Sequence, residues 1–209
     1  MALVRSLPQS AVLADLRRAV PELFDKLRPY GQQLMRGPSP LTPGQRELIA
    51  AYVSGVNSCR FCHGTHARVA QAFGMEEGTI KTLLDDIDLA PVEPRLKPIL
   101  RYARKLTETP NRMTEADAAA VYDAGWSDEA LIHAIAVCAY FNNMNRLVEG
   151  AGIVGTGRDY SAGAERLVAD GYLTGGDSTL PKPPANRRKV ASATRRSTSA
   201  ATMARGKSK

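Results

Sequence analysis

The sequence predicts an all-α fold, and three observations lead to this. Hydrophobic residues make up 44% of the 209-residue chain, which is enough for a real core. Aromatic residues reach only 6%, and runs that alternate apolar and polar residues are few, so strand signals are scarce. Alanine, leucine, arginine and glutamate dominate instead, and these residues favour helix.

The first two helices are expected over residues 11–18 and 21–35, where apolar residues recur at helical spacing. Pro21 separates them, because proline is tolerated at a helix start but not in its interior. The segment Gly37-Pro38-Ser39-Pro40 then predicts a clear break.

The next two helices have recognisable start signals. Thr42 is expected as the N-cap of a helix that continues to about Asn57, with Gln45 placed for a capping box. Ser58 is expected to cap the following helix, which Gly74 ends. The two helices are thus joined by a very short turn.

The later helices follow the same logic of caps and breaks. Thr114 and Ser127 are the expected N-caps of two of them, and Pro91 and Pro94 precede another. Their expected ranges are 79–84, 96–107, 114–125, 128–149 and 158–172. The sequence therefore predicts one helical domain of about eight helices over residues 1–175.

The positive charge of the chain is concentrated at its end. The formal charge is +7, but nine Lys and Arg residues lie between positions 181 and 209, which leaves 19 basic and 21 acidic residues elsewhere. Residues 176–209 lack the apolar side chains that offset ordering entropy, so we expect a disordered basic tail. Weak, salt-dependent contact with nucleic acid through this tail is the only nucleic-acid binding that we expect.

The N-terminal sequence predicts no signal peptide, since Met1-Ala2-Leu3-Val4-Arg5 leads into a polar amphipathic segment. No apolar run approaches the roughly 18 residues that a transmembrane helix needs. We therefore expect a cytoplasmic protein.

The segment from Cys59 to His66 carries the strongest chemical signal. Cys59 and Cys62 form a Cys-x-x-Cys pair, and His66 lies four positions after Cys62, on the same helical face. If Ser58 is the cap, Cys59 lies in the first helical turn, where the helix dipole favours thiolate over thiol. The imidazole is then placed to exchange protons with the sulfur.

Glu47 lies on the preceding helix among otherwise apolar neighbours. A carboxylate there is either on the solvent face or buried against a partner. Because the connecting turn is short, folding the two helices together brings Glu47 near the thiols.

Four kinds of site remain compatible with these residues. A structural disulfide or two inert core thiols are possible, as is a zinc site of Cys59, Cys62, His66 and a fourth ligand. No second Cys-x-x-Cys or His pair completes the zinc set. The Cys-x-x-Cys-His pattern ending at His63 also matches covalent haem attachment, which normally follows export. Thiol–disulfide redox chemistry without metal or cofactor fits best.

The whole motif resembles a known active site. Glu47, eleven residues, Cys59-x-x-Cys62, three residues and His66 is similar to the motif of alkylhydroperoxidase D-like (AhpD-like) proteins of the carboxymuconolactone decarboxylase-like superfamily. The resemblance covers roughly residues 10–170. Further segments resemble the branch called peroxidase-related enzymes, namely residues 50–57, 125–130, 135–138 and 141–146.

The resemblance implies a helical fold that assembles into homo-trimers or homo-hexamers, and a peroxiredoxin-type peroxidase activity. It implies that Cys62 attacks a hydroperoxide and that Cys59 supplies a proton and then forms a disulfide with Cys62. Glu47 and His66 would form the proton relay, and an external dithiol would reduce the disulfide. Phe61 departs from the best-known member, which carries a histidine between the cysteines.

Two other functions remain as alternatives. One is decarboxylation of a lactone acid, as in the namesake of the superfamily, although that chemistry does not need paired thiols. The other is a redox-responsive binding module whose disulfide alters assembly without turnover.

Other polar or reactive residues have simpler interpretations. Cys138 lies in an apolar helix and is expected to be an inert core thiol, and Trp126 is expected to anchor a helix junction. His133 has no evident partner. Asn142 and Asn145 share a helix face and are interpreted as helix or subunit packing residues, with lining of the redox pocket as the alternative.

Overall fold

The computed structural model describes residues 1–173, and every regular element in this part of the chain is helical. This confirms the all-α prediction. The elements are α1 (Leu13–Ala19), α2 (Pro21–Arg36), α3 (Pro43–Val56), α4 (Arg60–Ala72), α5 (Thr79–Asp85), α6 (Leu96–Glu108), a 3-10 turn (Pro110–Arg112), α7 (Glu115–Asp123), α8 (Asp128–Gly150) and α9 (Gly157–Asp170). The predicted basic tail, residues 176–209, lies outside the described residues.

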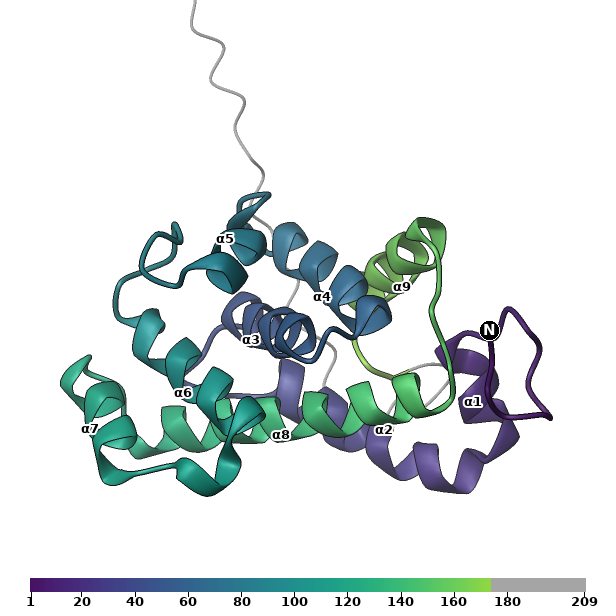
Figure 1. Cartoon of the computed structure of the whole chain (residues 1–209), viewed down its shortest axis with the longest axis horizontal. Helices are drawn as coiled ribbons and strands as arrows, with labels where there is room; N and C mark the ends of the chain where they lie inside the picture. Colours follow the sequence, from purple (N-terminus) through teal and green to yellow (C-terminus); the bar gives the residue numbers. More distant parts are fainter. Residues whose placement is uncertain (174–209) are drawn as a thin grey trace, which may run out of the picture.

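Helix α3 is the centre of the molecule. All nine residues from 46 to 54 are buried, so α3 is surrounded on every side rather than having one solvent face. It packs against α4, α6 and α8, while α9 packs on α4. Figure 1 shows the long helix α8 running beneath α3 and α4, with α1, α2 and α9 at one end and α6 and α7 at the other.

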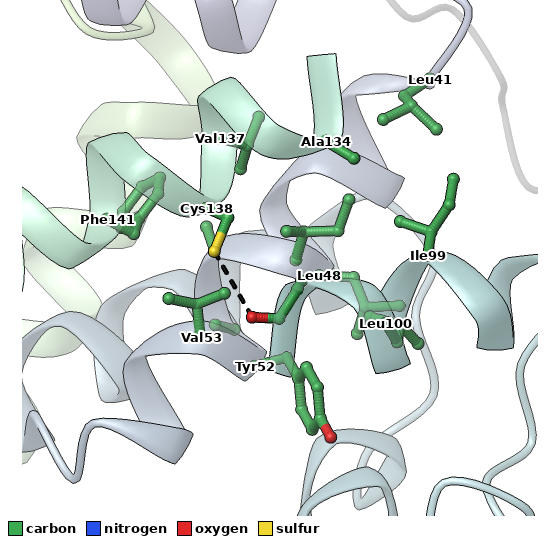
Figure 2. Close-up of a cluster of buried hydrophobic side chains, with 14 of the residues drawn as sticks. Leu41, Leu48, Tyr52, Val53, Ile99, Leu100, Ala134, Val137, Cys138 and Phe141 are labelled. Carbon is green, nitrogen blue, oxygen red and sulfur yellow. Dashed lines mark hydrogen bonds between the residues drawn. The ribbon is translucent and has the colours of Figure 1, made fainter. Parts of the chain in front are cut away.

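The main core forms where α3, α6 and α8 meet. Leu48 and Tyr52 of α3 and Leu100 of α6 are wholly buried there, together with Cys138 of α8 (Figure 2). The Cys138 thiol donates a 3.5 Å hydrogen bond to the carbonyl of Ala103, and burial raises its pKa. The prediction of an inert core thiol is confirmed.

The start of α3 follows the predicted capping box. The Gln45 amide N–H lies 3.2 Å from Thr42 Oγ1, and the Thr42 N–H lies 2.9 Å from Gln45 Oε1. Trp126 is buried as expected, and its indole N–H donates to the Arg95 carbonyl at 2.7 Å. The predicted capping box of α3 and the predicted anchoring position of Trp126 are thus confirmed.

The prediction that Ser58 caps α4 is wrong, because Cys59 is the N-cap. Ser58 instead adopts a left-handed backbone with φ of 57°. This conformation reverses the chain after α3 and lets the Cys59 N–H reach the Ser54 carbonyl at 2.9 Å. As a result Cys62, and not Cys59, lies in the first turn of α4.

None of the helices among residues 1–173 is both long and apolar enough to cross a membrane.

Candidate active site

Glu47 of α3 and His66 of α4 form the polar centre of the site. His66 Nδ1 lies 2.7 Å from Glu47 Oε2. The Glu47 residue is 0% exposed and His66 is 7% exposed, so this hydrogen bond is shielded from water. The short turn between α3 and α4 places the two helices side by side, and the predicted meeting of these residues is observed.

Two residues that the sequence did not single out complete this centre. The guanidinium of Arg36, at the end of α2, lies 2.6 Å from Glu47 Oε1. The Tyr172 hydroxyl, just after α9, donates to the same oxygen at 3.0 Å. Both carboxylate oxygens therefore have partners, as a buried charge requires.

The environment of Glu47 keeps its carboxylate ionised. Burial alone would raise its pKa, but the charge and hydrogen bond of His66, followed by those of Arg36, hold the pKa below its ordinary value. An ionised Glu47 accepts the Nδ1 proton of His66, which fixes the orientation of the ring. The opposite nitrogen, Nε2, is then the one that can exchange protons with a reacting group.

The two thiols differ in their surroundings. Cys59 is 0% exposed and Cys62 is 4% exposed, and both are free. A hydrogen bond with Cys62, and then burial, raises the pKa of Cys59. The same hydrogen bond lowers the pKa of Cys62, more than burial raises it. These opposite shifts favour the thiol form of Cys59 and, relative to an ordinary cysteine, the thiolate form of Cys62.

Asn145 of α8 is a third influence on Cys62. Its side-chain hydrogen bond to Cys62 lowers the pKa of that thiol. Asn145 is 1% exposed, its Nδ2 lies 3.0 Å from Ser54 Oγ, and its Oδ1 accepts from Asn57 at 2.9 Å. These bonds join α8 to α3 and to the turn after it, which supports the interpretation of Asn145 as a helix packing residue, and Asn145 is not among the residues that line the cavity beside Cys62.

A cavity of about 310 Å³ opens beside Cys62 and His66. Its walls are mainly apolar and include Val12, Leu13, Phe61, Phe141, Met144 and Leu167. Cys59 and Glu47 are not among the lining residues, so they lie behind Cys62 and His66, which face the cavity.

Phe61 forms part of this wall and packs edge-on against Tyr160, with ring centroids 6.1 Å apart. His63 is not in the wall, since its Nδ1 lies 3.0 Å from the Ala51 carbonyl. Of the two residues, only Phe61 therefore faces the cavity. In residues 1–173, no cluster of three or more His, Cys, Asp or Glu side chains is arranged to hold a metal ion.

Comparisons with known proteins show what the fold is similar to. Residues 21–105 match the model of the carboxymuconolactone decarboxylase family. The fold is similar to the alkylhydroperoxidase AhpD core of an uncharacterized peroxidase-related protein from Ralstonia eutropha JMP134, with a TM-score of 0.65 and 24% identity over 72% of this chain and 79% of that one. It is also similar to an uncharacterized peroxidase-related protein from Silicibacter sp. TM1040, with a TM-score of 0.64 and 23% identity over 70% of this chain and 78% of that one. No curated protein matches the chain by sequence.

Proposed function

We propose that this chain is a thiol-dependent peroxidase of the AhpD-like and carboxymuconolactone decarboxylase-like superfamily. The observation that carries the proposal is the position of Cys62. Its thiol lies at a cavity, its pKa is lowered by a hydrogen bond with the second thiol, and His66, which is hydrogen-bonded to the buried Glu47, lines the same cavity. A nucleophile, a resolving thiol and a proton relay are the parts that peroxide reduction needs.

The first step is attack of the Cys62 thiolate on the outer oxygen of a hydroperoxide. A sulfur–oxygen bond forms, the oxygen–oxygen bond breaks, and the alkoxide leaves with a proton as an alcohol. Cys62 is then a sulfenic acid. We assign delivery of the proton to His66 Nε2, because Nδ1 is held by Glu47.

The second step is condensation of the two cysteines. Cys59 sulfur attacks the sulfenic sulfur of Cys62, a disulfide forms, and the hydroxyl leaves with a proton as water. An external dithiol then reduces the disulfide by exchange and is itself oxidised. In sum, one hydroperoxide and one dithiol give an alcohol, water and one external disulfide.

The alternatives explain less of the site. Decarboxylation of a lactone acid uses no thiol pair, so it leaves the opposite pKa shifts of Cys59 and Cys62 without a role. A redox-responsive binding module needs the disulfide but not a cavity at Cys62 with a buried relay beside it. Our proposal also includes a homo-trimer or homo-hexamer, a cytoplasmic location, and no contact with nucleic acid beyond a weak one through the tail.

The test is steady-state consumption of hydroperoxide in the presence of several dithiol donors. Cys62→Ser should abolish turnover, since serine is not a nucleophile toward peroxide under these conditions. Cys138→Ser removes a thiol from the core and should leave turnover intact, which makes it the matched control. Turnover by Cys62→Ser at the wild-type rate would overturn the proposal.

A further inference from the structure

Two arginines line the same cavity as Cys62. Arg17 comes from α1 and Arg166 from α9, helices that lie far apart in the sequence and at the same end of the molecule (Figure 1). Both residues are half-buried, and most of the remaining wall is apolar. A pair of guanidiniums in such a wall costs free energy unless an anion neutralises it.

In the described part of the chain neither guanidinium forms an ion pair with a carboxylate, although the charge of Asp170, four residues after Arg166 on α9, acts to raise the pKa of Arg166. Within residues 1–173, none of the ion pairs involves Arg17 or Arg166. Arg166 donates one hydrogen bond, 3.4 Å long, to the Gly171 carbonyl. Burial, and then the charge of Arg166, lowers the pKa of Arg17, as expected for two like charges that are partly removed from water.

Two other acidic side chains, Asp159 and Asp15, have partners of their own. Asp159 lines the cavity, but its Oδ2 accepts from the N–H and hydroxyl of Thr156, both at 2.7 Å, at the start of α9. Asp15 pairs with Arg18, at 2.7 Å, and accepts the N–H of Val12. These carboxylates stabilise helix N-termini, as their position in the first turn predicts.

We propose that Arg17 and Arg166 bind the carboxylate of an anionic organic hydroperoxide whose apolar body fills the cavity and whose peroxide group reaches Cys62. Arginine is suited to this task because its planar fork binds a carboxylate by two parallel hydrogen bonds. A volume of about 310 Å³ admits a small organic acid and is larger than hydrogen peroxide requires. This substrate class rests on the proposed peroxidase function and goes beyond it.

The kinetic test compares three hydroperoxides on the full chain: cumene hydroperoxide, its para-carboxylate derivative, and the methyl ester of that derivative. The ester matches the acid in size but has no charge. We expect kcat/KM to be about tenfold or more higher for the carboxylate than for the ester, since a charge-assisted hydrogen bond has that magnitude. Equal values for acid and ester would overturn the proposal.

Variants connect this selectivity to the two arginines. Arg17→Met and Arg166→Met should each reduce the ratio of acid to ester kcat/KM by roughly tenfold. Arg17→Lys and Arg166→Lys keep the charge and should retain part of the ratio, which separates loss of charge from loss of fold. Arg18→Met is the matched control, because Arg18 is the exposed neighbour of Arg17 and pairs with Asp15. A ratio that is unchanged in both Met variants would contradict the assignment.

A binding experiment tests the anion site independently of peroxide turnover. Para-isopropylbenzoate and its methyl ester carry no peroxide, so their binding to the Cys62→Ser protein is measurable by calorimetry whatever the reaction is. The acid should bind at least tenfold more tightly, and Arg17→Met should remove that difference. Tighter binding of the acid by Cys62→Ser, together with no peroxide turnover by the wild-type protein, would support the anion site and reject the peroxidase function. Equal binding of acid and ester would reject the anion site itself.

Discussion

His66 Nδ1 lies 2.7 Å from a Glu47 carboxylate that is wholly removed from solvent. Glu47 does not line the cavity, whereas His66 does. Any effect of the carboxylate on a substrate must therefore pass through a partner that lines the cavity, which is either His66 or Tyr172, whose hydroxyl donates to Glu47 at 3.0 Å. In the proposed mechanism Glu47 is therefore a positioning and proton-relay residue, and His66 is the group that exchanges the proton.

Glu47→Gln should lower kcat for hydroperoxide reduction by about a hundredfold, within the range that general acid–base groups contribute. Glutamine keeps the shape of the side chain but not the charge that fixes the Nδ1 proton of His66. The measurement is kcat from steady-state peroxide consumption. Glu108→Gln, at an exposed glutamate that pairs with Arg104 on α6, is the control and should match the wild type. A Glu47→Gln enzyme with wild-type kcat would exclude the relay.

The same carboxylate makes folding stability depend on acid. The pKa of Glu47 is lower in the folded protein than its ordinary value of 4.5, so its contribution to stability is fully present above that value. The contribution is lost as the pH falls through the lower folded pKa. Urea unfolding at successive pH values should therefore show a shallower acid decline in Glu47→Gln than in the wild type.

At neutral pH, Glu47→Gln should lower the free energy of unfolding by about 3 kcal/mol, because it leaves the Arg36 guanidinium buried without its anion. The side chain of Arg36 is only 2% exposed. Substituting Arg36→Met together with Glu47→Gln should restore part of this loss. If the free energy of unfolding falls equally steeply with decreasing pH in the wild type and in Glu47→Gln, Glu47 is not the titrating group.

Asn145→Ala should move the pH profile of peroxide turnover to higher pH. The rate follows the thiolate form of Cys62, and loss of the Asn145 hydrogen bond raises the pKa of that thiol. At neutral pH we expect a rate about tenfold lower, recovered as the pH rises. The measurement is kcat/KM against pH.

Asn142→Ala is the matched control for this change. Asn142 lies one turn earlier on α8, and its amide donates to Thr107 Oγ1 at 3.1 Å and to the Cys138 carbonyl at 3.0 Å. It also accepts from Asn57, so its loss disturbs the same amide network. If Asn142→Ala shifts the profile as far as Asn145→Ala does, the effect is structural and the direct bond to Cys62 is not its cause.

The sequence was sufficient to predict those parts of the structure that depend on residues close together in the chain. Thr42 and Gln45 cap α3 through a three-residue spacing, and Cys62 and His66 share a face through a four-residue spacing. Glu47 could be placed near them because only a short turn separates its helix from theirs. These are local relationships, and spacing determines them.

The rest of the site depends on contacts that spacing does not encode. Arg36 and Tyr172 reach Glu47 from the ends of α2 and α9, and an arginine in a last helical turn is ordinarily explained by the helix dipole. Ser58 is a good N-cap residue in isolation, but the reversal after α3 requires a left-handed residue there and moves the cap to Cys59. In both cases tertiary geometry prevailed over local preference.

The close approach of α4 and α9 beside the cavity gives the last prediction. A Cβ atom on Gly64 would lie 2.6 Å from Tyr160 Cδ2, which is closer than real contacts allow. The Tyr160 ring is held, because its hydroxyl donates to the Val154 carbonyl at 3.0 Å and its face packs against Phe61. Alanine ordinarily favours a helix over glycine by about 1 kcal/mol, but overpacking costs about 1–3 kcal/mol.

Gly64→Ala should therefore destabilise the protein by up to about 2 kcal/mol in urea unfolding, despite the better helix propensity of alanine. Gly157→Ala is the matched control, since no atom lies within 4 Å of its Cβ position and its backbone is helical. The added methyl group would push Tyr160, and α9 with it, away from α4. Arg166 and Leu167 of α9 would then move, so KM for the carboxylate hydroperoxide should rise in Gly64→Ala and not in Gly157→Ala. A stabilised Gly64→Ala protein with unchanged KM would mean that α9 yields without cost and does not shape the cavity.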